Sequence, residues 1–219
     1  MVAKRRLAVF DLDGTLIHYE FDHFFEETLK ILPELGYPET TLSDLARYFE
    51  EYNYFGFVPK KRRHDFEEKF WSLMSREHYP SPREIEGAVE LLGQLVEREM
   101  TVAIATARST LPEQLERELR GTGLLKHISL IATKAGHESK WFDKTHQLRD
   151  LCTRLSLSPG DGFMVGDTPP DIWSAKAVGM GSTIAVLSGG IAEHILKKEN
   201  PDHLLDHVGE IKKLILPEE

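Results

Sequence analysis

The sequence has little cysteine, no long apolar run and no excess of basic residues, and each absence excludes a class of protein. One cysteine, Cys152, cannot form an internal disulfide, so a reducing, cytoplasmic location is the simplest expectation. No run approaches the roughly 18 consecutive apolar residues that a membrane-spanning helix needs, so we expect no membrane partner. The basic residues 4–6 precede only a short apolar stretch that contains aspartates, which is not typical of a signal peptide.

The chain of 219 residues has a formal net charge of −9. Non-specific nucleic-acid binding requires a basic surface, so no nucleic-acid partner is expected. An anionic substrate is not excluded, because a metal ion and a few local cations can reverse the field inside a site. Apolar residues make up 41% and charged residues 29%, which is typical of a soluble globular protein.

Short apolar runs alternate with helical patterns over most of the chain. The predicted strands are Leu7–Phe10, Thr101–Ala105, Ile128–Ala132, Gly162–Val165, Thr183–Leu187 and a weaker run at His203–Leu205. The predicted helices between and after them are Arg83–Glu99, Leu111–Arg120, Thr145–Leu155, Asp171–Val178 and Val208–Leu214. This alternation predicts an α/β fold, a Rossmann-like parallel sheet with helices on both of its faces.

Residues 18–82 interrupt the alternation, because no strong strand signal lies in this stretch. Its helical patterns are Phe21–Leu35, Thr41–Tyr52 and Arg63–Ser75, with glycine and proline at the joins. We therefore predict a small α-helical domain of residues 18–82, inserted into a core domain of residues 1–17 and 83–219.

Two carboxylates, Asp11 and Asp13, directly follow the first predicted strand in the string VFDLDGTL. In an open parallel sheet, ligands bind beyond the carboxyl ends of the strands, near the switch in strand order. Carboxylates this close repel each other and stay ionised only if a cation or hydrogen-bond donors compensate. Mg²⁺, a hard cation that takes oxygen ligands, is the natural candidate, and an ordinary turn or helix cap is the alternative.

Matching groups follow two other predicted strands. Thr106 follows the second strand, where its hydroxyl and nearby backbone N–H groups are suited to a phosphate or, alternatively, to a helix cap. The fourth strand runs into the string VGDTPPD, which contributes Asp167 and Asp171, with a capped loop as the alternative. A lysine is also expected, to offset the acids and to bind a phosphoryl group. The candidates for it are Lys134, Lys140 and Lys144.

The order of DLDGT, Thr106, a lysine and GDTPPD resembles that of the haloacid dehalogenase superfamily, and in particular its phosphoglycolate phosphatase-like branch. The resemblance implies a haloacid dehalogenase-like core whose inserted helices form a cap over the site. It also implies a Mg²⁺-dependent phosphatase that acts on a small phosphorylated metabolite. Phosphoglycolate, a sugar phosphate, a nucleotide and pyrophosphate are the alternative substrates. A phosphomutase and a non-catalytic regulatory protein on the same fold are the alternative functions.

The resemblance also implies roles for individual residues. Asp11 would be the nucleophile that forms an aspartyl-phosphate, and Asp13 the general acid and base. Asp13 favours phosphoryl transfer over dehalogenation, because a departing alkoxide needs a proton and a halide does not. Thr106 would hydrogen-bond the phosphoryl oxygens. Apart from the resemblance, Ala107 and Arg108 are candidate substrate contacts because they directly follow Thr106, and Arg108 is within reach of the leaving group.

Within the family the lysine usually opens the helix that precedes the last motif. This position implies Lys144, with Lys140 as the alternative. Mg²⁺ would be held by the Asp11 carboxylate, the Asp13 backbone carbonyl and Asp167. Asp171 would either be a further ligand or contact the ligands without touching the ion.

Two stretches of the predicted cap are candidates for substrate selection. The basic run at residues 59–64 is suited to a second anionic group on the substrate, or is simply a solvated helix start. The aromatic run at residues 48–57 either lines the inner face of the cap or forms its small core.

Overall fold

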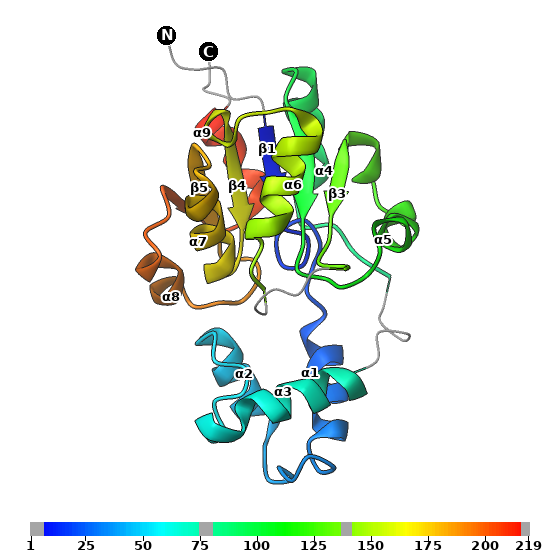
Figure 1. Ribbon diagram of the computed structural model, residues 1–219, viewed down its shortest axis with the longest axis vertical. Helices are drawn as coiled ribbons and strands as arrows, with labels where there is room; N and C mark the ends of the chain where they lie inside the picture. Colours follow the sequence, from blue (N-terminus) through cyan, green and yellow to red (C-terminus); the bar gives the residue numbers. More distant parts are fainter. Residues whose placement is uncertain (1–6, 75–80, 137–141, 216–219) are drawn as a thin grey trace. The chain divides into compact units, whose positions relative to one another are not determined.

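The computed structural model describes residues 7–74, 81–136 and 142–215 (Figure 1). The chain divides into two compact units. The core unit comprises Met1–His18 and Pro82–Glu219, and the insert unit comprises Tyr19–Ser81. Among the described residues, none of the helices has the length and apolar composition needed to cross a membrane.

The core unit is built on a parallel sheet, which confirms the predicted fold class. Its strand order in the described part of the chain is β3-β2-β1-β4-β5-β6. The strands are β1 (Leu7–Phe10), β2 (Thr101–Ala105), β3 (Leu130–Ala132), β4 (Gly162–Gly166), β5 (Ser182–Val186) and β6 (His203–Leu205). The order reverses between β1 and β4, because the chain first builds outward from β1 to β3 and then returns to the other side of β1. Ligands bind at such a switch point in open α/β sheets.

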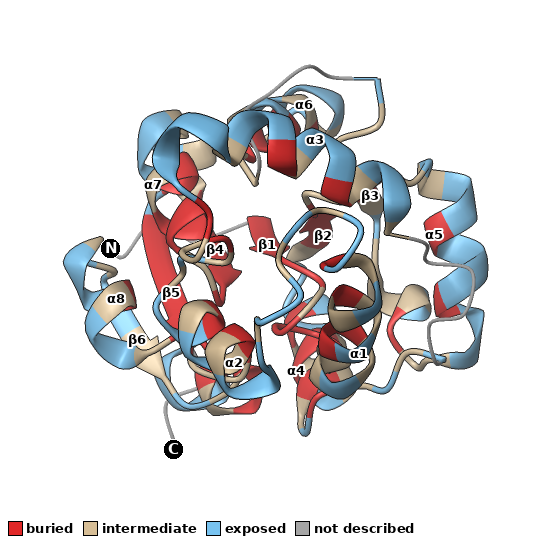
Figure 2. Ribbon diagram, turned by 90° about the horizontal axis from the view of Figure 1, so that it is seen from below, coloured by how far each residue is buried: buried red, intermediate tan, exposed pale blue. Residues whose placement is uncertain are grey.

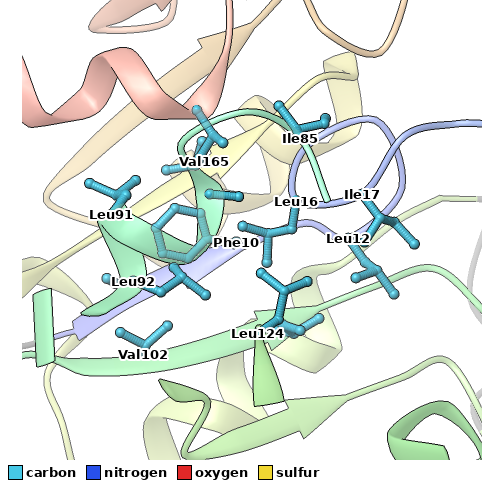
Figure 3. Packing of buried hydrophobic residues seen from close by; sticks show 14 of the residues in the cluster. Phe10, Leu12, Leu16, Ile17, Ile85, Leu91, Leu92, Val102, Leu124 and Val165 are labelled. Atoms are coloured by element: carbon cyan, nitrogen blue, oxygen red, sulfur yellow. The ribbon is translucent and has the colours of Figure 1, made fainter. Parts of the chain in front are cut away.

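Both faces of the sheet are covered, so the central strands read as continuous apolar runs. Leu7 and Val9 of β1 pack with α6 (Thr145–Leu155) and α7 (Pro169–Val178) on one face. Ala8 and Phe10 pack on the other face with α4 (Ala88–Glu97). Figure 3 shows Phe10 beside Leu91 and Leu92 of this helix, and Figure 2 shows how thoroughly β1 and β5 are buried.

Several predicted helix bounds in the core unit are wrong for local reasons. The helix predicted at Arg83–Glu99 begins only at Ala88, because Glu84 pairs with Ile17 and Gly87 adopts a φ of 77°. The helix predicted from Asp171 already begins at Pro169, where proline fits the first turn of a helix.

The remaining helical elements of the described core unit surround the sheet. They are α5 (Pro112–Glu118), α8 (Glu193–Lys198), α9 (Lys212–Ile215), and the 3₁₀ turns η2 (Leu119–Gly121), η3 (Leu125–His127), η4 (Pro159–Asp161) and η5 (Val208–Ile211). The short helix α8 was not predicted from the sequence.

The insert unit is helical in the part that the structure describes. It contains α1 (Phe21–Ile31), α2 (Leu42–Glu50), η1 (Lys60–Arg62) and α3 (Arg63–Leu73). The predicted helix from Phe21 ends before Leu35, because Pro33 cannot continue it. The predicted end of the third helix, Ser75, lies outside the described residues.

An aromatic cluster forms the interior of the insert unit. Its buried members are Phe24, Phe25, Phe49, Phe55, Phe66 and Phe70. The aromatic run at residues 48–57 therefore contributes Phe49 and Phe55 to this interior, whereas Tyr52 and Tyr54 stay half-buried. The basic run keeps Lys60, Lys61 and Arg62 exposed.

Truncation of the side chain at Leu92, which is fully buried between α4 and the sheet, tests how tightly this face is packed. We expect Leu92→Ala to lower the free energy of unfolding by about 2–5 kcal/mol, because a cavity replaces apolar contacts. The matched control is Val96→Ala on the same helix, where the side chain is 43% exposed and the expected change is within about 0.5 kcal/mol. Urea unfolding measures both, and equal effects would contradict the packing described here.

Candidate active site

The turn after β1 is tight and carries the first two acids in different directions. The Asp11 N–H continues the strand ladder by donating to the Val165 carbonyl at 2.8 Å. The chain then folds back, with the N–H groups of Leu16 and Ile17 donating to the Leu12 carbonyl at 2.9 and 3.1 Å. Gly14 adopts a φ of 77°, which explains why glycine occupies the fourth position of the DLDGT string.

Three buried carboxylates converge at the carboxyl ends of β1 and β4. Asp11, Asp167 and Asp171 each place a carboxylate oxygen within 4.8 Å of the others. The Thr15 hydroxyl donates to Asp167 Oδ1 at 2.9 Å and so fixes one oxygen of this group. A Cβ at Gly189 would lie 1.7 Å from Asp167 Oδ2, so the loop after β5 closely covers the cluster. Sequence reasoning gave no role to Thr15 or to this loop.

Lys144 is the buried cation that meets this acid cluster. Its Nζ lies 2.8 Å from Asp11 Oδ1 and also forms an ion pair with Asp171. The Ser174 hydroxyl accepts a hydrogen bond of 3.1 Å from the Lys144 N–H, so α7 also holds the backbone at the start of α6. Lys134 contributes its backbone N–H to the Arg108 carbonyl, and Lys140 lies outside the described residues.

Burial and mutual repulsion shape the charges of the acid cluster. Burial is the largest cause that raises the pKa of Asp11 to about 7, opposed by Lys144 and assisted by Asp171. Burial, and then the neighbouring Asp11, raise the pKa of Asp167 well above its ordinary value. Burial alone would lower the pKa of Lys144, but Asp11 and Asp171 outweigh it and raise that pKa.

The acid cluster has too much negative charge for Lys144 alone to neutralise. When all three carboxylates are ionised, one ammonium leaves two negative charges, which match one divalent cation. The donors are buried carboxylate oxygens, the ligand type that Mg²⁺ prefers. The described residues therefore fit a divalent cation on both charge and donor chemistry.

Thr106 lies at the end of β2, 1% exposed. Its N–H extends the pairing with β3 by donating to the Ala132 carbonyl at 3.0 Å. Its hydroxyl accepts a 3.2 Å hydrogen bond from the Arg108 N–H, which leaves the hydroxyl proton to donate elsewhere. The buried Gln147 of α6 donates to the Thr106 carbonyl at 3.3 Å. Ala107 lies between Thr106 and Arg108 in the loop that follows β2.

Arg108 binds the side chain of Asp13. Its Nε donates to Asp13 Oδ2 at 2.7 Å, and its Nη2 donates to Asp13 Oδ1, which gives a bidentate pair. A third donor, Nη1, lies 2.5 Å from Oε1 of Glu118 on α5. The Asp13 side chain is therefore held by a different cation from the one that holds Asp11. The sequence signalled neither this pairing nor the part of Glu118 in it.

Residues 8–186 match the haloacid dehalogenase-like hydrolases, and the chain belongs to this family. A protein from Caldanaerobacter subterraneus subsp. tengcongensis that bears the name pyrophosphatase PpaX is 28% identical over 227 residues, covering 97% of this chain and 95% of its own. A phosphoglycolate phosphatase from Methanopyrus kandleri is 32% identical over 102 residues, which are 44% of each chain. The names of these relatives are consistent with a phosphoric monoester hydrolase.

Solved structures share the fold over almost the whole chain. A predicted phosphatase from Clostridium acetobutylicum superposes with a TM-score of 0.75 at 19% identity, covering 97% of this chain and 98% of its own. The haloacid dehalogenase-like family protein SP0104 from Streptococcus pneumoniae gives 0.74 at 17% identity, covering 97% and 99%. These likenesses agree with the sheet order and with the helices on both faces.

The raised pKa values of Asp11 and Asp167 predict how pH affects the metal-free protein. Folding favours the protonated form of each group. The contribution of Asp11 to stability is therefore full below its ordinary pKa of 3.8 and is lost as the pH rises through about 7, and that of Asp167 is lost in the same direction as the pH rises above its ordinary range. At pH 8 we expect Asp167→Asn to raise the melting temperature of the metal-free protein by several degrees, because one buried charge is removed. Thermal unfolding in a chelator measures this effect.

The same experiment with Mg²⁺ tests the cation site. Mg²⁺ should raise the melting temperature of the wild type more at pH 8 than at pH 5, and should not raise that of Asp167→Asn. The control is Asp150→Asn, which removes an acid from a surface pair with Arg154 and should leave both responses unchanged. A full Mg²⁺ shift in Asp167→Asn would exclude this carboxylate as a ligand.

Proposed function

We propose that the protein is a Mg²⁺-dependent phosphatase that hydrolyses a small phosphorylated metabolite through an aspartyl-phosphate on Asp11. One observation carries the proposal: Asp11 is a buried carboxylate at the switch point of the sheet, bound by Lys144 and adjacent to Asp167. Pyrophosphate and phosphoglycolate, which the names of the relatives mention, are the first substrates to test. The proposed setting is the cytoplasm, where Cys152 remains a free and buried thiol.

The proposed magnesium ligands are the Asp11 carboxylate, the Asp13 backbone carbonyl and Asp167. Asp171 is better suited to orienting Lys144, because both of its oxygens already have partners in the described structure. Its Oδ2 accepts hydrogen bonds from the Thr168 N–H and hydroxyl at 2.9 and 2.6 Å, and its Oδ1 meets Lys144. When bound, Mg²⁺ would neutralise the charge that Asp11 and a phosphate share.

In the first proposed step, an oxygen of Asp11 attacks phosphorus and the bond from phosphorus to the leaving-group oxygen breaks. Asp13 donates a proton to the departing oxygen. In the second step, Asp13 takes a proton from water, the water oxygen attacks phosphorus, and the bond to Asp11 breaks. Inorganic phosphate leaves, and both carboxylates return to their starting forms.

Two further groups are placed to stabilise the phosphoryl group. Lys144 is held by α6 and α7 beside Asp11, so it both orients the nucleophile and offsets charge that develops on phosphate oxygens. Thr106 accepts its hydrogen bond from the backbone, so its hydroxyl proton is directed to another acceptor. With the N–H of Ala107, it is the proposed contact for the phosphoryl oxygens. Positioning and charge stabilisation supply most of the acceleration in phosphoryl transfer.

Replacement of the nucleophile is the most direct test. Asp11→Asn keeps the size of the side chain but removes the attacking carboxylate, so turnover of an aryl phosphate should fall by about 10³-fold or more. Phosphate release with Mg²⁺, and its loss in a chelator, are the measurements, with Asp150→Asn as a control that keeps full activity. Wild-type turnover by a folded Asp11→Asn protein would refute the assignment of the nucleophile.

The role of Asp13 predicts a dependence on the leaving group. An alkoxide needs a proton as it departs and an aryl oxide needs it less, so Asp13→Asn should slow the first step more for an alkyl phosphate than for an aryl phosphate. Rapid-quench kinetics of phosphoenzyme formation compare the two substrates in a single turnover. The same loss for both would mean that Asp13 does not act as the proton donor.

A further inference from the structure

Asp13 and Arg108 together pose a question that the proposed chemistry leaves open. In the structure both oxygens of Asp13 accept hydrogen bonds from the guanidinium of Arg108. A general acid must turn one oxygen toward the departing group, so this bidentate pair has to open or shift during turnover. The two N–H donors that face Asp13, on Nε and Nη2, form the guanidinium fork of Arg108. This fork then needs another pair of anionic oxygens, because a buried guanidinium without partners is costly.

Arg108 is well held for such an exchange. Its side chain is only 9% exposed, and its Nη1 stays bound to Glu118 of α5, which does not depend on Asp13. Its backbone N–H is tied to the Thr106 hydroxyl, so the fork is fixed to the loop that is proposed to bind phosphate. Release of Asp13 would therefore free two N–H donors without displacing the arginine.

The contacts also say which side of the site the fork occupies. Asp11 meets Lys144 of α6, whereas Asp13 meets Arg108 and, through it, the end of α5. The general acid lies beside the leaving group by the definition of its role. A fork that binds the general acid is thus within reach of atoms close to the leaving oxygen.

We infer that Arg108 selects substrates whose leaving group carries a second anionic group, a carboxylate or a phosphate, which takes the place of Asp13 on the guanidinium fork. The inference rests on the proposed phosphatase function and adds the substrate class. Arginine is suited to this task, because its parallel N–H groups match both carboxylate and phosphate oxygens. Arrival of the right anion also releases Asp13 from the guanidinium, and the freed carboxylate takes up a proton from water, which it then donates to the departing oxygen, so recognition and catalysis are coupled.

Two substrate pairs test the inference. The leaving group of one member carries a second anionic group (the anionic member), and that of the other does not (the neutral member). Phosphoglycolate is compared with 2-hydroxyethyl phosphate, and pyrophosphate with 4-nitrophenyl phosphate, because the leaving groups within each pair are similar in basicity. For the wild type we expect kcat/KM to be roughly 10- to 100-fold higher for the anionic member of at least one pair, the range expected for charge-assisted hydrogen bonds. The preferred pair distinguishes a carboxylate from a phosphate as the second group.

Variants of Arg108 then assign that preference. Arg108→Gln should bring the ratio close to one, mainly through loss of activity on the anionic member, and Arg108→Lys should restore part of it. The control is Arg120→Gln, which removes an exposed arginine just after α5 and should leave the ratio unchanged. Because each ratio comes from one preparation of one variant, partial unfolding lowers both members alike and does not alter it.

Three results would overturn the inference or its basis. Equal losses on both members in Arg108→Gln would make Arg108 a residue that only positions Asp13. Equal rates on both members of each pair in the wild type would exclude selection of a second anion, although the phosphatase function would stand. Hydrolysis of none of the four compounds would refute the proposed function itself.

Discussion

The contact between Asp11 and Lys144 constrains the rest of the site. Both groups are buried, so each would be costly to ionise without the other, and their separation of 2.8 Å fixes the end of β1 against the start of α6. Asp171 binds the same ammonium from α7, so one cation joins three elements of the core unit. The pair does not balance the charge of the acid cluster, and this imbalance makes a divalent cation fit. A site that is unfavourable when empty is in this way made favourable by its ligand.

The sheet brings these groups together through its register. Phe10, the last residue of β1, aligns with Ile104 of β2 on one side and with Val165 of β4 on the other. The acids and the hydroxyl that follow these strands therefore emerge at the same level. Parallel strands end on the same edge of a sheet, so residues far apart in the sequence become neighbours directly at the strand ends, with no long loop needed to bring them together.

Much of this was predictable from local patterns. Apolar runs that end in acids gave the strands, and the positions of Asp11 and Asp167 followed from where those runs stop. What the sequence could not give depends on contacts between distant side chains. The resemblance implied Lys144 from its position at the start of a helix, but its ion pairs with Asp11 and Asp171 could not be read from that position. The early part of the predicted helix from Arg83 failed for a similar reason, since its pairing with Ile17 is non-local.

The two acids of the DLDGT turn are separated by a single residue, yet the fold gives them opposite environments. Asp11 is buried beside an ammonium and two further carboxylates, whereas Asp13 is partly exposed and paired with a guanidinium. Environments that differ this much are how one protein assigns different roles to chemically identical groups. The chain bends at Leu12, between the two acids, so the first side chain meets Lys144 of α6 and the second meets Arg108. The proposed nucleophile is thereby fixed in place, while the proposed proton donor is held by a partner that, on our inference, an anionic substrate replaces.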